Sequence, residues 1–168
     1  MRLVGIIAKK KDAQIIRKEI NKYQTEETEK IEIIEITKQS IKNLRNIKFE
    51  GIIFLDNIEL NSDEYRYMNE LIIKERFLLL NGDISIDILE KIQIEEPIQI
   101  ITFGFNSKST ITISSVREDK AIICVQRDIK KANGEILENQ EKEIELKKDN
   151  KKIYNNLVVF IIKELHNL

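Results

Sequence analysis

Four short apolar runs without alternation restrict the folds open to this chain more than any other feature. The runs are Arg2–Ile7, Gly51–Leu55, Phe77–Leu80 and Ile98–Phe103. A strand with one face in water alternates apolar and polar residues, whereas a strand buried on both faces is apolar along its length. Segments with helical spacing of apolar residues separate the runs, which indicates right-handed β-α-β units. The sequence therefore predicts an α/β fold whose mostly parallel sheet is flanked by helices.

The other elements of this part follow from spacing and from capping residues. Ile31–Ile36 is a further strand candidate, and Asp12 is expected to be the N-cap of the first helix. That helix presents Ile15, Ile16 and Ile20 on one face. Helices are expected at Asp12–Tyr23, Gln39–Asn46, Ser62–Lys74, Ile84–Ile92 and Lys151–His166.

The pattern changes after Gly104, where strand-like segments follow one another without helices between them. Asn133-Gly134 is a strong signal for a two-residue turn. These segments are expected to add antiparallel strands at the edge of the same sheet, so that residues 1–168 form a single domain. The expected strands are Thr110–Val116, Ala121–Gln126 and Lys142–Leu146.

The charge balance and the cysteine content exclude several classes of protein. Lys and Arg total 28 against 29 Asp and Glu, for a net charge of -1. A dedicated nucleic-acid binder carries a basic surface, so no nucleic-acid partner is expected. Cys124 is the only cysteine, so no internal disulfide can form, and it is interpreted as a core residue. Since no apolar stretch suits a signal peptide or a membrane span, a cytoplasmic protein with no membrane partner is predicted.

Polar segments follow the predicted parallel strands, at the edge of the sheet where ligands bind in such folds. They are expected to converge around one cleft. Its lysines supply positive potential, while Asp56 and Asp83 repel a bare polyphosphate, so a small or singly charged anion is the predicted ligand. The candidate ligand-binding residues are Lys9, Lys10, Lys11, Asn57, Asn81, Asp83, Asn106 and Lys108.

Four of these strand ends also follow a known pattern. Ile100–Phe105 (IITFGF) is similar to a strand that ends in T-[FY]-G, and Leu78–Asp83 (LLLNGD) to one that ends in N-x-D-D. Ile52–Ile58 is similar to a strand leading into T-N-I, and Val4–Ala13 occupies the place of a strand, P-loop and helix. In this order the segments resemble the central ATP-binding domain of the Mur ligase family, over roughly the first three-quarters of the chain. The resemblance implies a P-loop or Rossmann-like three-layer domain, related to enzymes that form the peptide of peptidoglycan.

The departures from the family pattern fall on its catalytic parts. A working P-loop needs glycines around the phosphates, a lysine, and a Ser or Thr for Mg²⁺. The stretch Ile6–Ala13 reads IIAKKKDA, without a glycine in the turn or a Ser or Thr after the lysines, and Asp12 would repel a γ-phosphate. Asn57–Leu60 continues without the family's His, and Asn69 or Leu71 replaces its modified lysine. The comparison implies a degenerate P-loop with no catalytic residue, metal or cofactor, as in a pseudoenzyme.

Several candidate residues also have an ordinary structural interpretation. Lys9–Lys11 either hold an anion at a helix N-terminus or form a solvated turn. Asp56 and Asp83 either bind Mg²⁺ or act as turn and cap residues, which is the favoured interpretation. The loop Gly104–Ser109 (GFNSKS) is either an anion pocket or a plain polar connection. His166 is close to the end of the chain and is assigned no chemistry.

The predicted function is that of a non-catalytic, Mur-ligase-like binding or regulatory protein, linked through the resemblance to cell-wall precursor metabolism. Two alternatives stay open. One is an ATP-dependent amide ligase subunit, whose missing domains come from another chain. The other is a generic α/β binding module whose likeness to the family is accidental. The expected partner is an unknown protein or a small anionic ligand, and a homodimer is also left open.

Overall fold

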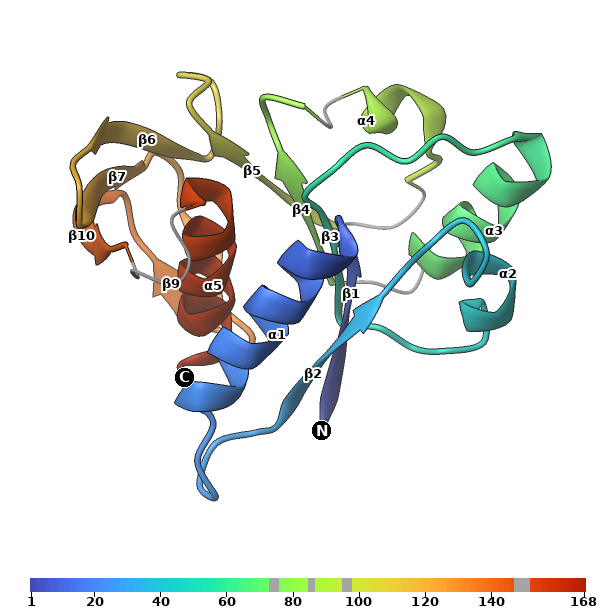
Figure 1. The fold of residues 1–168 in the computed structure, drawn as a ribbon, viewed down its shortest axis with the longest axis horizontal. Coiled ribbons are helices and arrows are strands. Elements are labelled where there is room, and N and C mark those ends of the chain that lie inside the picture. Colours follow the sequence, from blue (N-terminus) through green and yellow to red (C-terminus); the bar gives the residue numbers. More distant parts are fainter. Residues whose placement is uncertain (73–75, 85–86, 95–97, 147–151) are drawn as a thin grey trace.

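The computed structural model describes residues 1–72, 76–84, 87–94, 98–146 and 152–168. An eight-stranded sheet in the order β10-β7-β6-β5-β4-β3-β1-β2 runs through the molecule (Figure 1), and β8 and β9 form a separate ribbon. The strands are β1 (Arg2–Ile7), β2 (Ile31–Glu35), β3 (Gly51–Phe54), β4 (Phe77–Asn81), β5 (Gln99–Gly104), β6 (Ile111–Val116), β7 (Lys120–Val125), β8 (Ile129–Lys130), β9 (Ile136–Leu137) and β10 (Gln140–Glu145). The helices are α1 (Lys10–Tyr23), α2 (Ile41–Leu44), α3 (Ser62–Ile72), α4 (Ile88–Lys91) and α5 (Ile153–His166).

The four apolar runs form neighbouring parallel strands, which confirms the predicted sheet. β1 pairs with β3, β3 with β4, and β4 with β5, all in parallel register. β2 pairs with the other side of β1. Every residue of β3 and β4 is buried, as the absence of alternation in their sequences requires.

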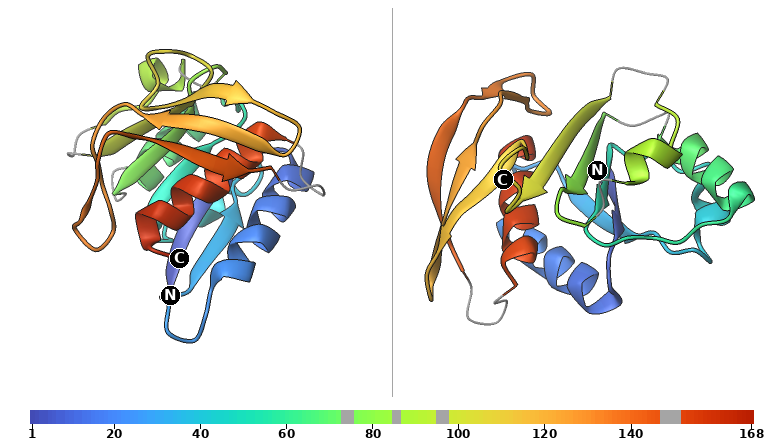
Figure 2. Two further views of the ribbon diagram at one scale, coloured as in Figure 1. Left: turned by 90° about the vertical axis from the view of Figure 1, so that its left-hand side faces the viewer. Right: turned by 90° about the horizontal axis from the view of Figure 1, so that it is seen from above.

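Helices cover both faces of the parallel strands (Figures 1 and 2). On one face, α1 and α5 share a core with the sheet that includes Ile6, Ile16 and Leu157. On the other face, α2, α3 and α4 pack around a second core that includes Phe54 and Met68. β6, β7 and β10 curve around α5 (Figure 2), so the C-terminal helix is packed between the two parts of the sheet.

The strands after β5 extend the sheet as expected, with one difference. β7 is antiparallel to both β6 and β10, and the turn at Asn133-Gly134 joins β8 to β9. β6, however, runs parallel to β5 through the pairs Phe103–Ile111 and Gly104–Thr112. The expected antiparallel pairing is therefore present between β6 and β7, whereas β6 joins the parallel strands through β5. The reason is that β6 begins level with the end of β5 and continues in the same direction.

The start of the first helix also differs from the expectation. Lys9 is the N-cap of α1, and Asp12 lies in the first turn instead of capping it. The carboxylate of Asp12 is bound by side chains of α5, a long-range contact that the local sequence does not reveal. α4 is shorter than predicted. Residues 73, 74, 85, 86 and 151 of the predicted helices lie outside the described part of the chain.

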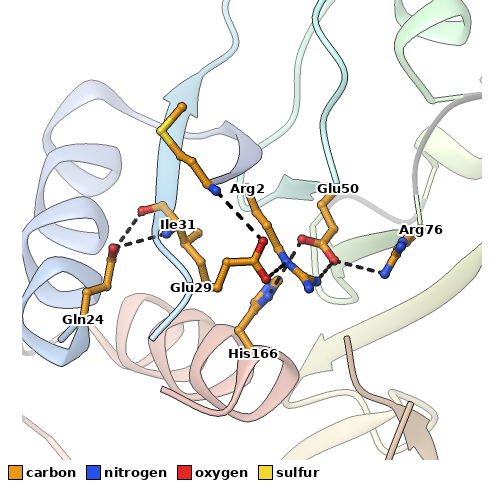
Figure 3. A network of polar contacts seen from close by, with 8 residues as sticks. Arg2, Gln24, Glu29, Ile31, Glu50, Arg76 and His166 are labelled. Carbon is orange, nitrogen blue, oxygen red and sulfur yellow. Dashed lines mark hydrogen bonds and ion pairs between the residues drawn. The ribbon is translucent and has the colours of Figure 1, made fainter. Parts of the chain in front are cut away.

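A network of polar side chains lies at the edge of the sheet where the parallel strands begin (Figure 3). Glu50, just before β3, accepts a hydrogen bond from Arg2, and Arg76 lies 3.6 Å from the same carboxylate. His166, at the end of α5, places Nδ1 3.9 Å from Glu50, and its side chain is only 3% exposed. Burial, together with the nearby Arg2 and Arg76, lowers the pKa of His166 to about 4. His166 is therefore neutral at pH 7, and it lies at the opposite end of the sheet from the candidate ligand-binding residues.

The depressed pKa of His166 predicts that the protein loses stability between pH 6.5 and pH 4. The unfolded chain protonates its histidine near 6.5, whereas the folded chain resists protonation until about 4, so acid favours unfolding in that interval. At about 1.4 kcal/mol per pKa unit, the loss reaches about 3 kcal/mol at pH 4. Urea unfolding of the wild type and of His166→Gln from pH 7 to pH 4 checks this. Parallel stability curves for the two proteins would contradict it.

Candidate functional site

The parallel strands follow the order 2-1-3-4-5, a common order of doubly wound sheets. In such sheets the chain leaves β1 toward one edge and β3 toward the other, and ligands bind in the crevice at the carboxyl ends of these two strands. A cavity of about 390 Å³ lies at this position. It is lined by Lys9, Asp12, Leu55, Asp56, Asn81, Ile84, Lys152, Ile153, Tyr154 and Asn155. We call it the switch-point cavity.

The first wall of the switch-point cavity is the connection from β1 to α1. The backbone N–H of Lys9 donates a hydrogen bond of 2.9 Å to Oδ2 of Asp56, which follows β3. Backbone N–H groups at a helix N-terminus are the usual donors to a phosphate. Here a carboxylate of the protein itself binds one of these groups.

The second wall is the start of α5, which is tied to α1 through Asp12. Nζ of Lys152 lies 2.8 Å from both carboxylate oxygens of Asp12, and Nδ2 of Asn155 donates to Oδ1 at 2.9 Å. Burial raises the pKa of Asp12, but the hydrogen bonds from Lys152 and Asn155 outweigh it and bring the pKa below its usual value. Asp12 is therefore ionised and neutralised by a residue 140 positions later in the chain.

Asp83, next to the cavity, holds the loop after β5 against α5. It accepts hydrogen bonds from the backbone N–H groups of Phe105 and Asn106 at 2.7 and 2.9 Å. The hydroxyl of Tyr154 donates to the same carboxylate at 2.9 Å. Burial and this bond raise the pKa of Tyr154 to about 12, so the phenol stays protonated at pH 7. The carboxylate of Asp83 therefore links the loop after β5 to α5 within the protein.

The structure brings some of the predicted residues together and separates others. Lys9 and Asn81 line the switch-point cavity, and Asp83 lies beside it through its bond to Tyr154. Lys10, Lys11, Asn106 and Lys108 are exposed at the same edge of the sheet but do not line this cavity. Asn57 lines a second cavity of about 320 Å³, between β3 and the helices of the other face.

The sequence did not predict that α5 supplies Lys152, Tyr154 and Asn155 to the site. α5 was assigned only to packing, because most of its residues form an apolar stripe. One feature of the sequence could have indicated this role, because Asn155 and Asn156 are adjacent amides in an otherwise apolar helix. Both are buried in the structure. A buried amide needs a hydrogen-bond partner, which for Asn155 is Asp12.

No family model matches the chain, and no curated protein matches it. Fold and cavity together define an α/β protein with a doubly wound parallel sheet and a polar cavity at its switch point. In the described ranges, no group of three or more His, Cys, Asp or Glu side chains is arranged to hold a metal ion. None of the helices in the described part of the chain has the length and apolar character to cross a bilayer.

The contact between Asp12 and Lys152 is expected to stabilise the fold. Lys152→Met leaves the buried carboxylate without its cation, so we expect a loss of about 1–3 kcal/mol in the free energy of unfolding at pH 7. The deficit should shrink as the pH falls below 3.8 and disappear once Asp12 is protonated in the folded protein, where its pKa lies below that value. The control is Lys11→Met, which removes an exposed lysine next to Asp12 in the first turn of α1. Equal stabilities of the two variants in urea unfolding would argue against the contact.

A second prediction concerns Gly104, which has φ +146° and faces Asp83. A Cβ on this residue would lie 2.2 Å from Oδ2 of Asp83. Gly104→Ala should therefore cost about 1–3 kcal/mol and weaken the bonds of Asp83 to the loop. Gly134→Ala is the matched control, since φ is also positive there, at 92°, but no atom lies within 4 Å of the added Cβ. Equal melting temperatures of the two variants would show that Asp83 does not restrict this position.

Proposed function

We propose that this chain is a non-catalytic binding or regulatory protein whose ligand occupies the switch-point cavity. Three observations support the proposal. The cavity lies where doubly wound sheets bind their ligands, and its volume of about 390 Å³ suits a small molecule. Its lining joins charged and amide groups to apolar side chains, the mixture that orients a small ligand.

The bond between Asp56 and the backbone N–H of Lys9 carries the non-catalytic part of the proposal. A nucleotide triphosphate bound at the start of α1 needs these N–H groups and a loop that curls around its phosphates. The connection has no glycine, and Asp12 and Asp56 place two carboxylates where the phosphates would lie. Phosphoryl transfer also needs groups that hold and polarise the transferred phosphate, and here the N–H of Lys9 is already bonded to Asp56.

A relationship to the Mur ligase family remains part of this proposal. Its support is the order of the four strand-end segments on neighbouring parallel strands. Such a relative would keep the scaffold and use its cavity to bind a regulatory ligand, such as a cell-wall precursor, or to present a surface to a protein partner. The alternative of a ligase subunit completed by another chain requires ATP hydrolysis, which an assay can detect.

We predict that the protein neither hydrolyses ATP nor is stabilised by it. A thermal-shift panel of ATP with Mg²⁺, uridine-diphosphate sugars and a set of small carboxylates is the test, since a ligand of the folded state raises the melting temperature by mass action. A small molecule of the panel should raise the midpoint, and ATP should not. Phosphate release that disappears in Lys11→Ala would overturn the non-catalytic assignment. A panel in which no compound shifts the midpoint would count against a ligand in the cavity.

A further inference from the structure

We propose that the ligand of the switch-point cavity is a small monocarboxylate with an apolar body; this rests on the proposed function. The inference rests on which polar groups of the cavity lining can still bind a ligand, because several are already hydrogen-bonded within the protein. Asp12 uses both carboxylate oxygens within the protein. Asn81 donates to the carbonyl of Leu55 and accepts from the N–H of Asp83. These buried groups form the wall and have little capacity left for a ligand.

The groups with remaining capacity are mainly cationic. Among the described residues, Lys9 has no carboxylate within ion-pair distance of its ammonium group, but its charge helps to lower the pKa of Asp12, and the residue lines the cavity. Lys152 is bonded to Asp12, but its side chain is 57% exposed, so it can also donate to a ligand. These two lysines precede different helices, α1 and α5, and both residues line the cavity. A carboxylate between them accepts from both ammonium groups.

The charge of the lining limits the ligand to one negative charge. Lys9 and Lys152 balance Asp12 and Asp56, so the four side chains are neutral together. The N-termini of the two helices add a partial positive charge of about 0.5 each. The total favours a monoanion. A phosphate monoester carries a charge of about -1.5 to -2 at pH 7, and the N–H of Lys9 that would help to bind it is already bonded to Asp56.

The apolar part of the lining determines the rest of the ligand. Leu55, Ile84 and Ile153 face the cavity, and Ile84 is 40% exposed. Covering such a side chain removes apolar surface from water and favours binding. The cavity volume of about 390 Å³ is near the lower end of the range for small-molecule sites. It therefore fits a carboxylate attached to one ring or a short branched chain.

The test uses benzoate as the probe, benzamide as its neutral counterpart and phenyl phosphate as the more highly charged one, each measured by calorimetry on the full chain. Benzoate should bind, and benzamide should bind at least about tenfold more weakly, because it lacks the charge.

Lys9→Met should weaken benzoate binding about tenfold, since it removes a charged donor. Lys10→Met, one position later and outside the lining, should leave the affinity unchanged. Lys152→Arg, which keeps the charge, should retain binding. The melting temperature of each variant shows whether it is folded.

The outcomes separate this inference from the proposed function. Benzamide or phenyl phosphate binding as tightly as benzoate, or Lys9→Met binding like the wild type, would overturn the monocarboxylate inference. The cavity would then still be a binding site. Failure of all three probes also overturns the inference. In that case the thermal-shift panel decides the proposed function, which survives if another compound stabilises the protein and fails if none does.

Discussion

The packing of α5 against α1 is the interaction on which the candidate site depends. A parallel sheet must be covered on both faces, because its strands are apolar on both. The crossover helices α2, α3 and α4 cover one face, and α1 covers only part of the other. The last helix fills the remaining area, between the sheet and the curved strands β6, β7 and β10 (Figure 2). Its N-terminus is thereby placed at the carboxyl ends of the parallel strands, where Lys152 meets Asp12.

The two ends of α5 illustrate how different the two edges of the sheet are. At its C-terminus, the side chain of His166 is buried near Glu50 and Arg2. His166 lines none of the cavities found among the described residues. At its N-terminus, Lys152 and Tyr154 line a cavity and bind acidic residues from two other connections. The C-terminal end of α5 is held in place by the burial of His166. The second end combines a structural contact with polar groups at a cavity, and it is therefore the end where we propose the ligand site.

The parallel strands could be predicted from the sequence because their apolar runs are local and continuous. The position of the switch-point cavity could also be predicted, since the ends of parallel strands share one edge, and two of the predicted residues, Lys9 and Asn81, line it. The role of Asp12 could not be predicted. Its position suggested an N-cap, but a cation and an amide from the other end of the chain bind it instead. The direction of β6 also depends on a pairing that the apolar pattern does not specify, the two contacts with the end of β5.

The resemblance to a nucleotide-binding domain suggests ATP as the ligand, whereas the geometry at the start of α1 favours a small monocarboxylate. The bond between Asp56 and the N–H of Lys9 is the feature that disfavours ATP. The most direct test is a titration of the isotope-labelled protein followed by the amide resonances of its backbone. Benzoate is expected to shift the amides of Lys9, Ile84 and Tyr154 in a saturable manner, while ATP with Mg²⁺ leaves them unchanged. Saturable shifts at Lys9, Lys10 and Lys11 with ATP, and none with benzoate, would contradict the account.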